Sequence, residues 1–170
     1  MMNLNIHKEG VFLKLKWFLS IGILLGSLLS GCSSHSEEKH EGQEYVNGDI
    51  REETKHKEEL PSFLDNKNED MKLLYTAAAE SKPILDHIPC YCGCGDSVGH
   101  RSNYDCFVHD NRENGAVVWD DHATKCGVCL EIAAQSIMDY QEGKSIEQIR
   151  KEIDKKYEEG FPEPTPTPEI

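Results

Sequence analysis

The hydrophobic pattern of the chain predicts three helices in its second part. The first spans 68–82, where apolar residues recur three and four positions apart until Pro83 ends the run. The second spans 124–141, and the third opens at Ser145, where Ser-Ile-Glu-Gln has the pattern of a capping box. Because only a short turn with Gly143 separates the last two helices, they are expected to form an antiparallel hairpin.

The segment 83–123, between the first two helices, shows no helical period. It is rich in Gly and Asn, and only Val117-Val118-Trp119 resembles a short strand. A loop of this length inside a compact domain is usually functional or cross-linked. The predicted fold class is therefore mainly α: a small helical domain over 68–160, whose long cysteine-rich loop packs on a C-terminal helical hairpin, with little or no sheet.

Both flanks of this domain are predicted to lie outside its core. Residues 32–67 are nearly all polar and cannot bury enough apolar surface to fold, so they are expected to form a flexible tether. Residues 161–170 are proline-rich and are expected to be extended and uninvolved. A domain of about 90 residues folds with a small margin, so metal or disulfides within it would add stability.

The N-terminus has the features of a secretory signal. Three lysines precede an apolar stretch over 17–29, which is followed by Leu29-Ser30-Gly31-Cys32. This tetrapeptide matches the bacterial lipoprotein box, and the resemblance implies removal of 1–31 and attachment of acyl chains such as palmitate to Cys32. The chain is therefore expected to be held on the extracytoplasmic face of the cell membrane, with the lipid bilayer as a partner.

Charge narrows the classes of partner. The formal net charge is −13, which argues against binding of nucleic acid and suits a protein that handles cations. No nucleophile–base pair, phosphate-binding loop or nucleotide fingerprint stands out, so an enzyme is not expected.

Six cysteines dominate the candidate chemistry, and they are either ligands of a soft metal or partners in disulfides. They are Cys90, Cys92, Cys94, Cys106, Cys126 and Cys129.

Two of these cysteines, Cys126 and Cys129, have the C-x-x-C spacing at the start of a predicted helix. This spacing places both sulfurs on one face of the helix, and the helix dipole there favours thiolates. The pair suits either a metal chelate or a redox disulfide.

The other notable run is Cys90-Tyr91-Cys92-Gly93-Cys94. In a flat strand the alternate α-carbons would lie about 6.6 Å apart, whereas thiolates on one tetrahedral ion lie within about 4 Å of each other. Gly93 and Gly95 allow the backbone to curl so that the sulfurs can converge. Disulfides inside the run would be strained, so a disulfide scaffold would have to pair it with the three remaining cysteines.

Thiolate-rich sites select Cu(I), Zn(II) or iron–sulfur clusters. Six thiols match a small Cu(I) cluster or two bridged ions better than one four-coordinate zinc, and iron–sulfur assembly is not expected outside the membrane. Copper is therefore ranked first and zinc second. His100 is included as a further candidate ligand, and His122 is a weaker one.

The chain resembles a known family at these residues. Pro89-Cys90-Tyr91-Cys92-Gly93-Cys94 is similar to the hexapeptide that names the PCYCGC-motif lipoproteins of Gram-positive bacteria. Gly99-His100, Asp105-Cys106-Phe107 and the helix with Cys126 and Cys129 also resemble that family. The resemblance implies a surface lipoprotein and leaves its activity open.

Taken together, the sequence predicts a membrane-anchored lipoprotein that binds a soft metal ion for storage, delivery or sensing. A metal-accepting or metal-donating membrane protein is the expected partner. Two alternatives stay open: a disulfide-stapled protein-interaction domain, and a thiol–disulfide oxidoreductase that uses Cys126 and Cys129. Counting free thiols separates the metal site, which needs them, from the scaffold, which does not.

Overall fold

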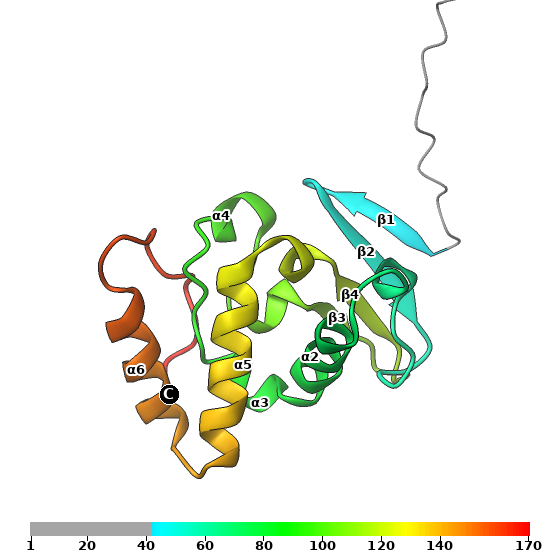
Figure 1. Cartoon of the computed structure of the whole chain (residues 1–170). Coiled ribbons are helices and arrows are strands. Elements are labelled where there is room, and N and C mark those ends of the chain that lie inside the picture. Colours follow the sequence, from blue (N-terminus) through cyan, green and yellow to red (C-terminus); the bar gives the residue numbers. More distant parts are fainter. Residues whose placement is uncertain (1–41) are drawn as a thin grey trace, which may run out of the picture. The chain divides into compact units, whose positions relative to one another are not determined.

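Within residues 42–170, which the computed structural model describes, four strands form an antiparallel sheet in the order β1-β2-β4-β3 (Figure 1). The strands are β1 (Gln43–Val46), β2 (Asp49–Thr54), β3 (Val108–Asn111) and β4 (Val117–Asp120). The predicted signal peptide and Cys32 lie outside the described residues.

This sheet overturns the prediction of a mainly α fold with little or no sheet. The strand in the long loop, β4, is joined by three strands that the hydrophobic pattern did not indicate. β1 and β2 consist mostly of polar residues, and most of their side chains are exposed or partly exposed. Charged residues are usual on such strands. The prediction that 32–67 forms a flexible tether is therefore wrong from Gln43 onward.

A turn signal marks the first hairpin. Asn47 and Gly48 join β1 to β2, with φ angles of 52° and 93°. Two central residues with positive φ are typical of a type I′ turn, whose twist matches that of the flanking strands. Asn-Gly in this polar stretch was therefore the available evidence for a hairpin.

The three predicted helices are present, with shifted ends. They are α2 (Glu69–Glu80), α5 (Gly127–Gln141) and α6 (Ile146–Tyr157). The Asn68 side chain caps α2, and the capping box at Ser145 is confirmed at the start of α6.

Shorter helical elements connect these helices to the sheet. α3 (Lys82–Leu85) follows α2 directly, and α4 (Gly95–Val98) interrupts the long loop. The described residues also contain three 3-10 turns: η1 (Ser62–Leu64), η2 (Tyr104–Cys106) and η3 (His122–Lys125). Since η3 occupies the predicted first turn of the second helix, α5 begins three residues later than expected.

The main core lies between the sheet, α2 and α5. The rings of Tyr75 and Phe107 pack edge to face with centroids 5.0 Å apart, and the fully buried Trp119 lies beside them. Three cysteines, Cys90, Cys106 and Cys129, belong to this core. The long loop is thus folded into the interior, where the thiols of Cys90 and Cys106 are shielded from water.

The C-terminal segment packs against the loop. The Thr165 amide donates to the Cys90 carbonyl at 3.0 Å, and the Cys90 amide donates to Thr165 Oγ1 at 2.8 Å. Figure 1 shows this red segment beside the green loop that leads into α4. We call residues 161–168 the C-terminal strap. The expectation that the tail is uninvolved is therefore wrong.

Among the described residues, none of the helices is long and apolar enough to cross a membrane.

Candidate metal centre

Two cysteines of the cluster come from the start of α5. Cys126 is the N-cap residue with extended backbone, and its side chain makes no capping hydrogen bond, so the sulfur is available to the site. Cys129 lies one turn further on and is completely buried. This is the shared face that the C-x-x-C spacing predicts.

The PCYCGC run and Cys106 approach α5 from the loop. Asn103 fixes the position of this loop against α5. Its backbone amide donates to the Ile88 carbonyl at 2.8 Å, and its side-chain amide donates to the Cys129 carbonyl at 3.2 Å. Gly93 has a φ of 76°, which turns the chain between Cys92 and Cys94. The run therefore curls, as expected from its glycines.

Four ligand atoms converge at the N-terminus of α5. They belong to Cys92, His122, Cys126 and Cys129, and all lie within 4.8 Å of one another. Cys92 Sγ is 3.9 Å from His122 Nε2. We call this group the first position. Three thiols and one imidazole form a donor set typical of four-coordinate zinc, and they also suit Cu(I).

A second group of thiols adjoins the first. The sulfurs of Cys90, Cys106 and Cys129 lie within 4.8 Å of one another, and those of Cys90 and Cys129 are 3.3 Å apart. This separation is well above the disulfide bond length of about 2.05 Å, and all six cysteines of the described region are free. We call this group the second position. Cys129 belongs to both positions.

His100 lies at the edge of the cluster. A ligand atom of His100 lies within 4.8 Å of ligand atoms of Cys106 and His122, and its ring meets that of His122 nearly at right angles. The side chain is 1% exposed, yet neither ring nitrogen has a hydrogen-bond partner among the described residues. Its Nε2 lies 3.6 Å from Asp120 Oδ2, which is too far for a good hydrogen bond.

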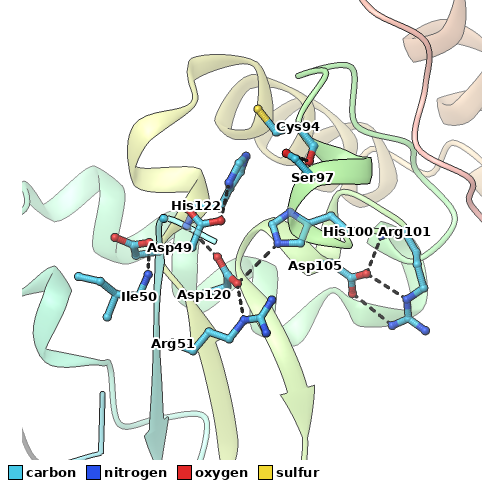
Figure 2. A network of polar contacts seen from close by, with 12 residues as sticks. Asp49, Ile50, Arg51, Cys94, Ser97, His100, Arg101, Asp105, Asp120 and His122 are labelled. Carbon is cyan, nitrogen blue, oxygen red and sulfur yellow. Dashed lines mark hydrogen bonds and ion pairs between the residues drawn. The ribbon is translucent and has the colours of Figure 1, made fainter. Parts of the chain in front are cut away.

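Two buried carboxylates support the imidazoles, and sequence reasoning missed their role. Asp49 Oδ2 lies 3.0 Å from His122 Nδ1, and Asp120 Oδ1 accepts a hydrogen bond from the His122 amide at 3.0 Å. Figure 2 shows Asp49 and Asp120 beside the two histidines, with Arg51 bound to Asp120. A carboxylate on one nitrogen of a histidine orients the other nitrogen toward a metal.

Hydrogen bonds within the cluster shift the pKa values of its thiols. Hydrogen bonds from Cys126 and then Cys129 lower the pKa of Cys92 to about 4. Hydrogen bonds with Cys129 and then Cys90 lower the pKa of Cys106. The pKa of Cys129 is raised, chiefly by its hydrogen bonds with Cys106 and Cys126, so this thiol holds its proton and donates to its neighbours. The cluster thus favours a mixture of thiols and thiolates.

The imidazole of the first position is also shifted. Burial lowers the pKa of His122, but hydrogen bonds with Cys92 and Asp49 outweigh burial and raise the pKa to about 9. In the metal-free protein at neutral pH, a protonated His122 therefore faces a Cys92 thiolate. A metal cation bound between them would replace that proton.

The structure brings together five of the six candidate cysteines, and Cys94 is outside both positions. Cys94 Sγ lies 3.8 Å from the Cys92 carbonyl oxygen, beside α4. Burial, followed by the charge of Cys92, raises its pKa. His100 lies beside the cluster, and the weaker candidate His122 lies within the first position.

The fold and the site define a small α+β domain with a connected, largely buried cluster of cysteine and histidine side chains. This arrangement could hold a metal ion. The chain belongs to the family described as proteins of unknown function with a PCYCGC motif, whose sequence profile matches residues 21–170. The resemblance noted from the hexapeptide is thereby confirmed. Neither the curated proteins nor the solved structures include a match.

Proposed function

We propose that this chain is a lipid-anchored extracytoplasmic protein that binds a soft metal ion for storage, delivery or sensing. The observation that carries the proposal is the convergence of Cys92, Cys126, Cys129 and His122 at the start of α5. These ligands come from three separate elements, and no single element could place them together.

The surroundings of the first position also favour a metal. Asp49 holds His122 through Nδ1, which leaves Nε2 facing the Cys92 sulfur. In protein metal sites, a carboxylate usually binds one ring nitrogen of a histidine while the other ring nitrogen binds the metal. Thiolates at a helix N-terminus are further stabilised by the helix dipole.

Cu(I) is the favoured ion and Zn(II) is the second choice. One zinc ion would be satisfied by the four ligands of the first position, which leaves the buried thiols of Cys90 and Cys106 without a role. Cu(I) accepts three thiolates and readily shares thiolates between ions, so it can use all five sulfurs. The iron–sulfur alternative gains no support from this arrangement.

A direct test is metal analysis of the full chain, purified in detergent under reducing conditions and loaded with Cu(I) or Zn(II). Cys126→Ser removes a ligand of the first position and is expected to lower affinity by at least tenfold. Cys94→Ser is the matched control, since Cys94 is outside both positions. Equal affinity of the two variants would contradict the proposed site.

The proposed anchor rests on the sequence, where Leu29-Ser30-Gly31-Cys32 follows an apolar stretch. Cys32→Ala is expected to leave the leader uncleaved or to release the protein from membranes, because the acylated sulfur is lost. Fractionation of cells and mass spectrometry of the N-terminus measure both outcomes. A processed variant that stays on the membrane as the wild type does would exclude lipid attachment at Cys32.

Thiol–disulfide exchange is a second candidate, and one contact favours Cys90 and Cys129 for it in place of the Cys126 and Cys129 pair considered from the sequence. The sulfurs of Cys90 and Cys129 are 3.3 Å apart, so a small movement would allow a disulfide. Both residues are at most 1% exposed, however, and a substrate disulfide cannot reach them without local opening. Thiol counting on anaerobically purified protein whose Cys32 sulfur is acylated decides: six reactive thiols after unfolding favour metal binding, and four favour this disulfide.

A further inference from the structure

We propose that the cluster holds two metal ions that share the sulfur of Cys129. This inference rests on the proposed metal-binding function and extends it to the number of ions and to Cu(I) as the cargo. The first ion lies in the first position, and the second is bound by Cys90, Cys106 and Cys129.

The first argument is the position of Cys129. Its sulfur lies within 4.8 Å of the ligand atoms of both groups, which otherwise have no member in common. Two ions that each bind one sulfur at about 2.3 Å are at most about 4.6 Å apart. A single bridging thiolate therefore fits two ions, whereas one ion cannot bind both groups at once.

The second argument is the spacing of the three thiols. Sulfurs arranged as a triangle around one ion, each at about 2.3 Å, lie about 4 Å apart. In the second position the Cys90 and Cys129 sulfurs are 3.3 Å apart, and all three lie within 4.8 Å. Small side-chain movements would complete a three-thiolate site. Cu(I) accepts this trigonal geometry, whereas Zn(II) strongly prefers four ligands.

The third argument is charge. Cys90, Cys106 and Cys129 are at most 1% exposed, so water cannot stabilise several thiolates there. The basic side chains of Lys125 and Arg51 are already paired, Lys125 with Asp49 and Asp121 and Arg51 with Asp120, and His122 faces Cys92 of the first position. Once these thiols release their protons, a bound cation is needed to balance the charge of the thiolates.

The fourth argument is the buried imidazole of His100, which contacts Asp120 at 3.6 Å but makes no hydrogen bond within the described residues. A buried polar group without a hydrogen bond costs about 1–3 kcal/mol, and both nitrogens of His100 are in this state among the described residues. A ligand atom of the His100 ring lies within 4.8 Å of the Cys106 sulfur. His100 is thus placed to act as an additional donor when the second ion binds.

The experiment is an anaerobic titration of the full chain in detergent with Cu(I), against a chromophoric Cu(I) chelator. The wild type and Cys94→Ser are expected to bind two ions per chain. Cys106→Ser is expected to bind one, and Cys129→Ser is expected to lose tight binding of both. His100→Ala should keep two ions but weaken the second at least tenfold. X-ray absorption should show metal–metal scattering in the wild type that Cys106→Ser lacks.

The outcomes separate this inference from the function on which it rests. One ion per wild-type chain, lost in Cys126→Ser, would overturn the two-ion cluster and leave metal binding intact. No bound ion would overturn both. Circular dichroism reports whether Cys106→Ser is folded. If it is not, Cys90→Ser takes its place. If neither variant folds, absence of metal–metal scattering in the wild type overturns the inference.

Discussion

At the residue scale, the contact between Asp49 and His122 gives the proposed metal site its oriented imidazole. Asp49 opens β2 and His122 opens η3, and the 3.0 Å contact between them fixes the imidazole with Nε2 toward Cys92. Without this carboxylate, the ring would lose both its orientation and part of its basicity.

Asp49→Asn is therefore expected to weaken metal binding by about 10- to 100-fold. Asparagine keeps an acceptor near Nδ1 but removes the negative charge, so the thiols stay in place while the histidine becomes a poorer ligand. Competition with a chelator of known affinity measures the change. Asp110→Asn, which changes a half-exposed carboxylate on β3, is the control. Equal affinity in the two variants would show that Asp49 does not act on the site.

The six cysteines could be selected from their spacing alone, because thiols this dense require a partner. Asp49 could not be selected from the sequence, since an aspartate after Asn-Gly is also an ordinary turn residue. Its role depends on the pairing of β2 with β4, which aligns Arg51 with Asp120 and draws Asp49 toward His122. The sequence also could not predict that Cys94 lies outside both positions, because its placement depends on the turn at Gly93.

At the element scale, the C-terminal strap holds the PCYCGC run in its curled form. Besides the two hydrogen bonds between Thr165 and Cys90, Arg150 of α6 donates to the Pro168 carbonyl at 3.2 Å. A β-carbon added to Gly93 would lie 2.7 Å from Pro162 Cγ, so the strap needs glycine at this point.

Gly93→Ala and Gly99→Ala form a matched pair that tests the strap. Both glycines have nearly the same φ, 76° and 78°, but a β-carbon on Gly99 would meet no atom within 4 Å. Both variants should lose stability from backbone strain, and Gly93→Ala should lose about 1–3 kcal/mol more from the overlap with Pro162. Urea denaturation of the metal-free proteins measures the difference. Equal losses of unfolding free energy in the two variants would mean that the strap does not pack closely against Gly93.

The elements differ in how far the sequence reveals them. The helices follow from apolar periodicity and capping residues, which are local signals, so α2, α5 and α6 were predicted within a few residues. β1, β2 and β3 depend on pairing between distant segments, and their polar faces give little period-2 pattern. The strap was missed because a proline-rich composition does not indicate where an extended segment packs.

At the scale of the whole molecule, metal binding and folding are expected to be coupled. The ligands come from the PCYCGC run, η2, η3 and α5, so an ion in the cluster would connect segments that are far apart in the sequence. Binding that is specific to the folded chain adds stability, by about 2.7 kcal/mol when free metal exceeds the dissociation constant 100-fold.

Removing the metal is therefore expected to lower the midpoint of thermal unfolding by about 10 °C or more. The measurement compares metal-loaded and chelator-treated protein in the same reducing buffer. Cys126→Ser should show a much smaller difference, while Cys94→Ser should behave as the wild type does. Identical midpoints for metal-loaded and metal-free wild-type protein would show that metal binding does not stabilise the fold.

X-ray absorption spectroscopy of the full chain loaded with Cu(I) tests the metal centre most directly, because it identifies the atoms bound to the ion. Sulfur neighbours at about 2.3 Å, with a smaller contribution from imidazole, are expected from the first position. In Cys92→Ser and Cys129→Ser the sulfur contribution should fall, and in Cys94→Ser it should not. A first shell made only of oxygen and nitrogen, unchanged in all three variants, would contradict a thiolate metal centre.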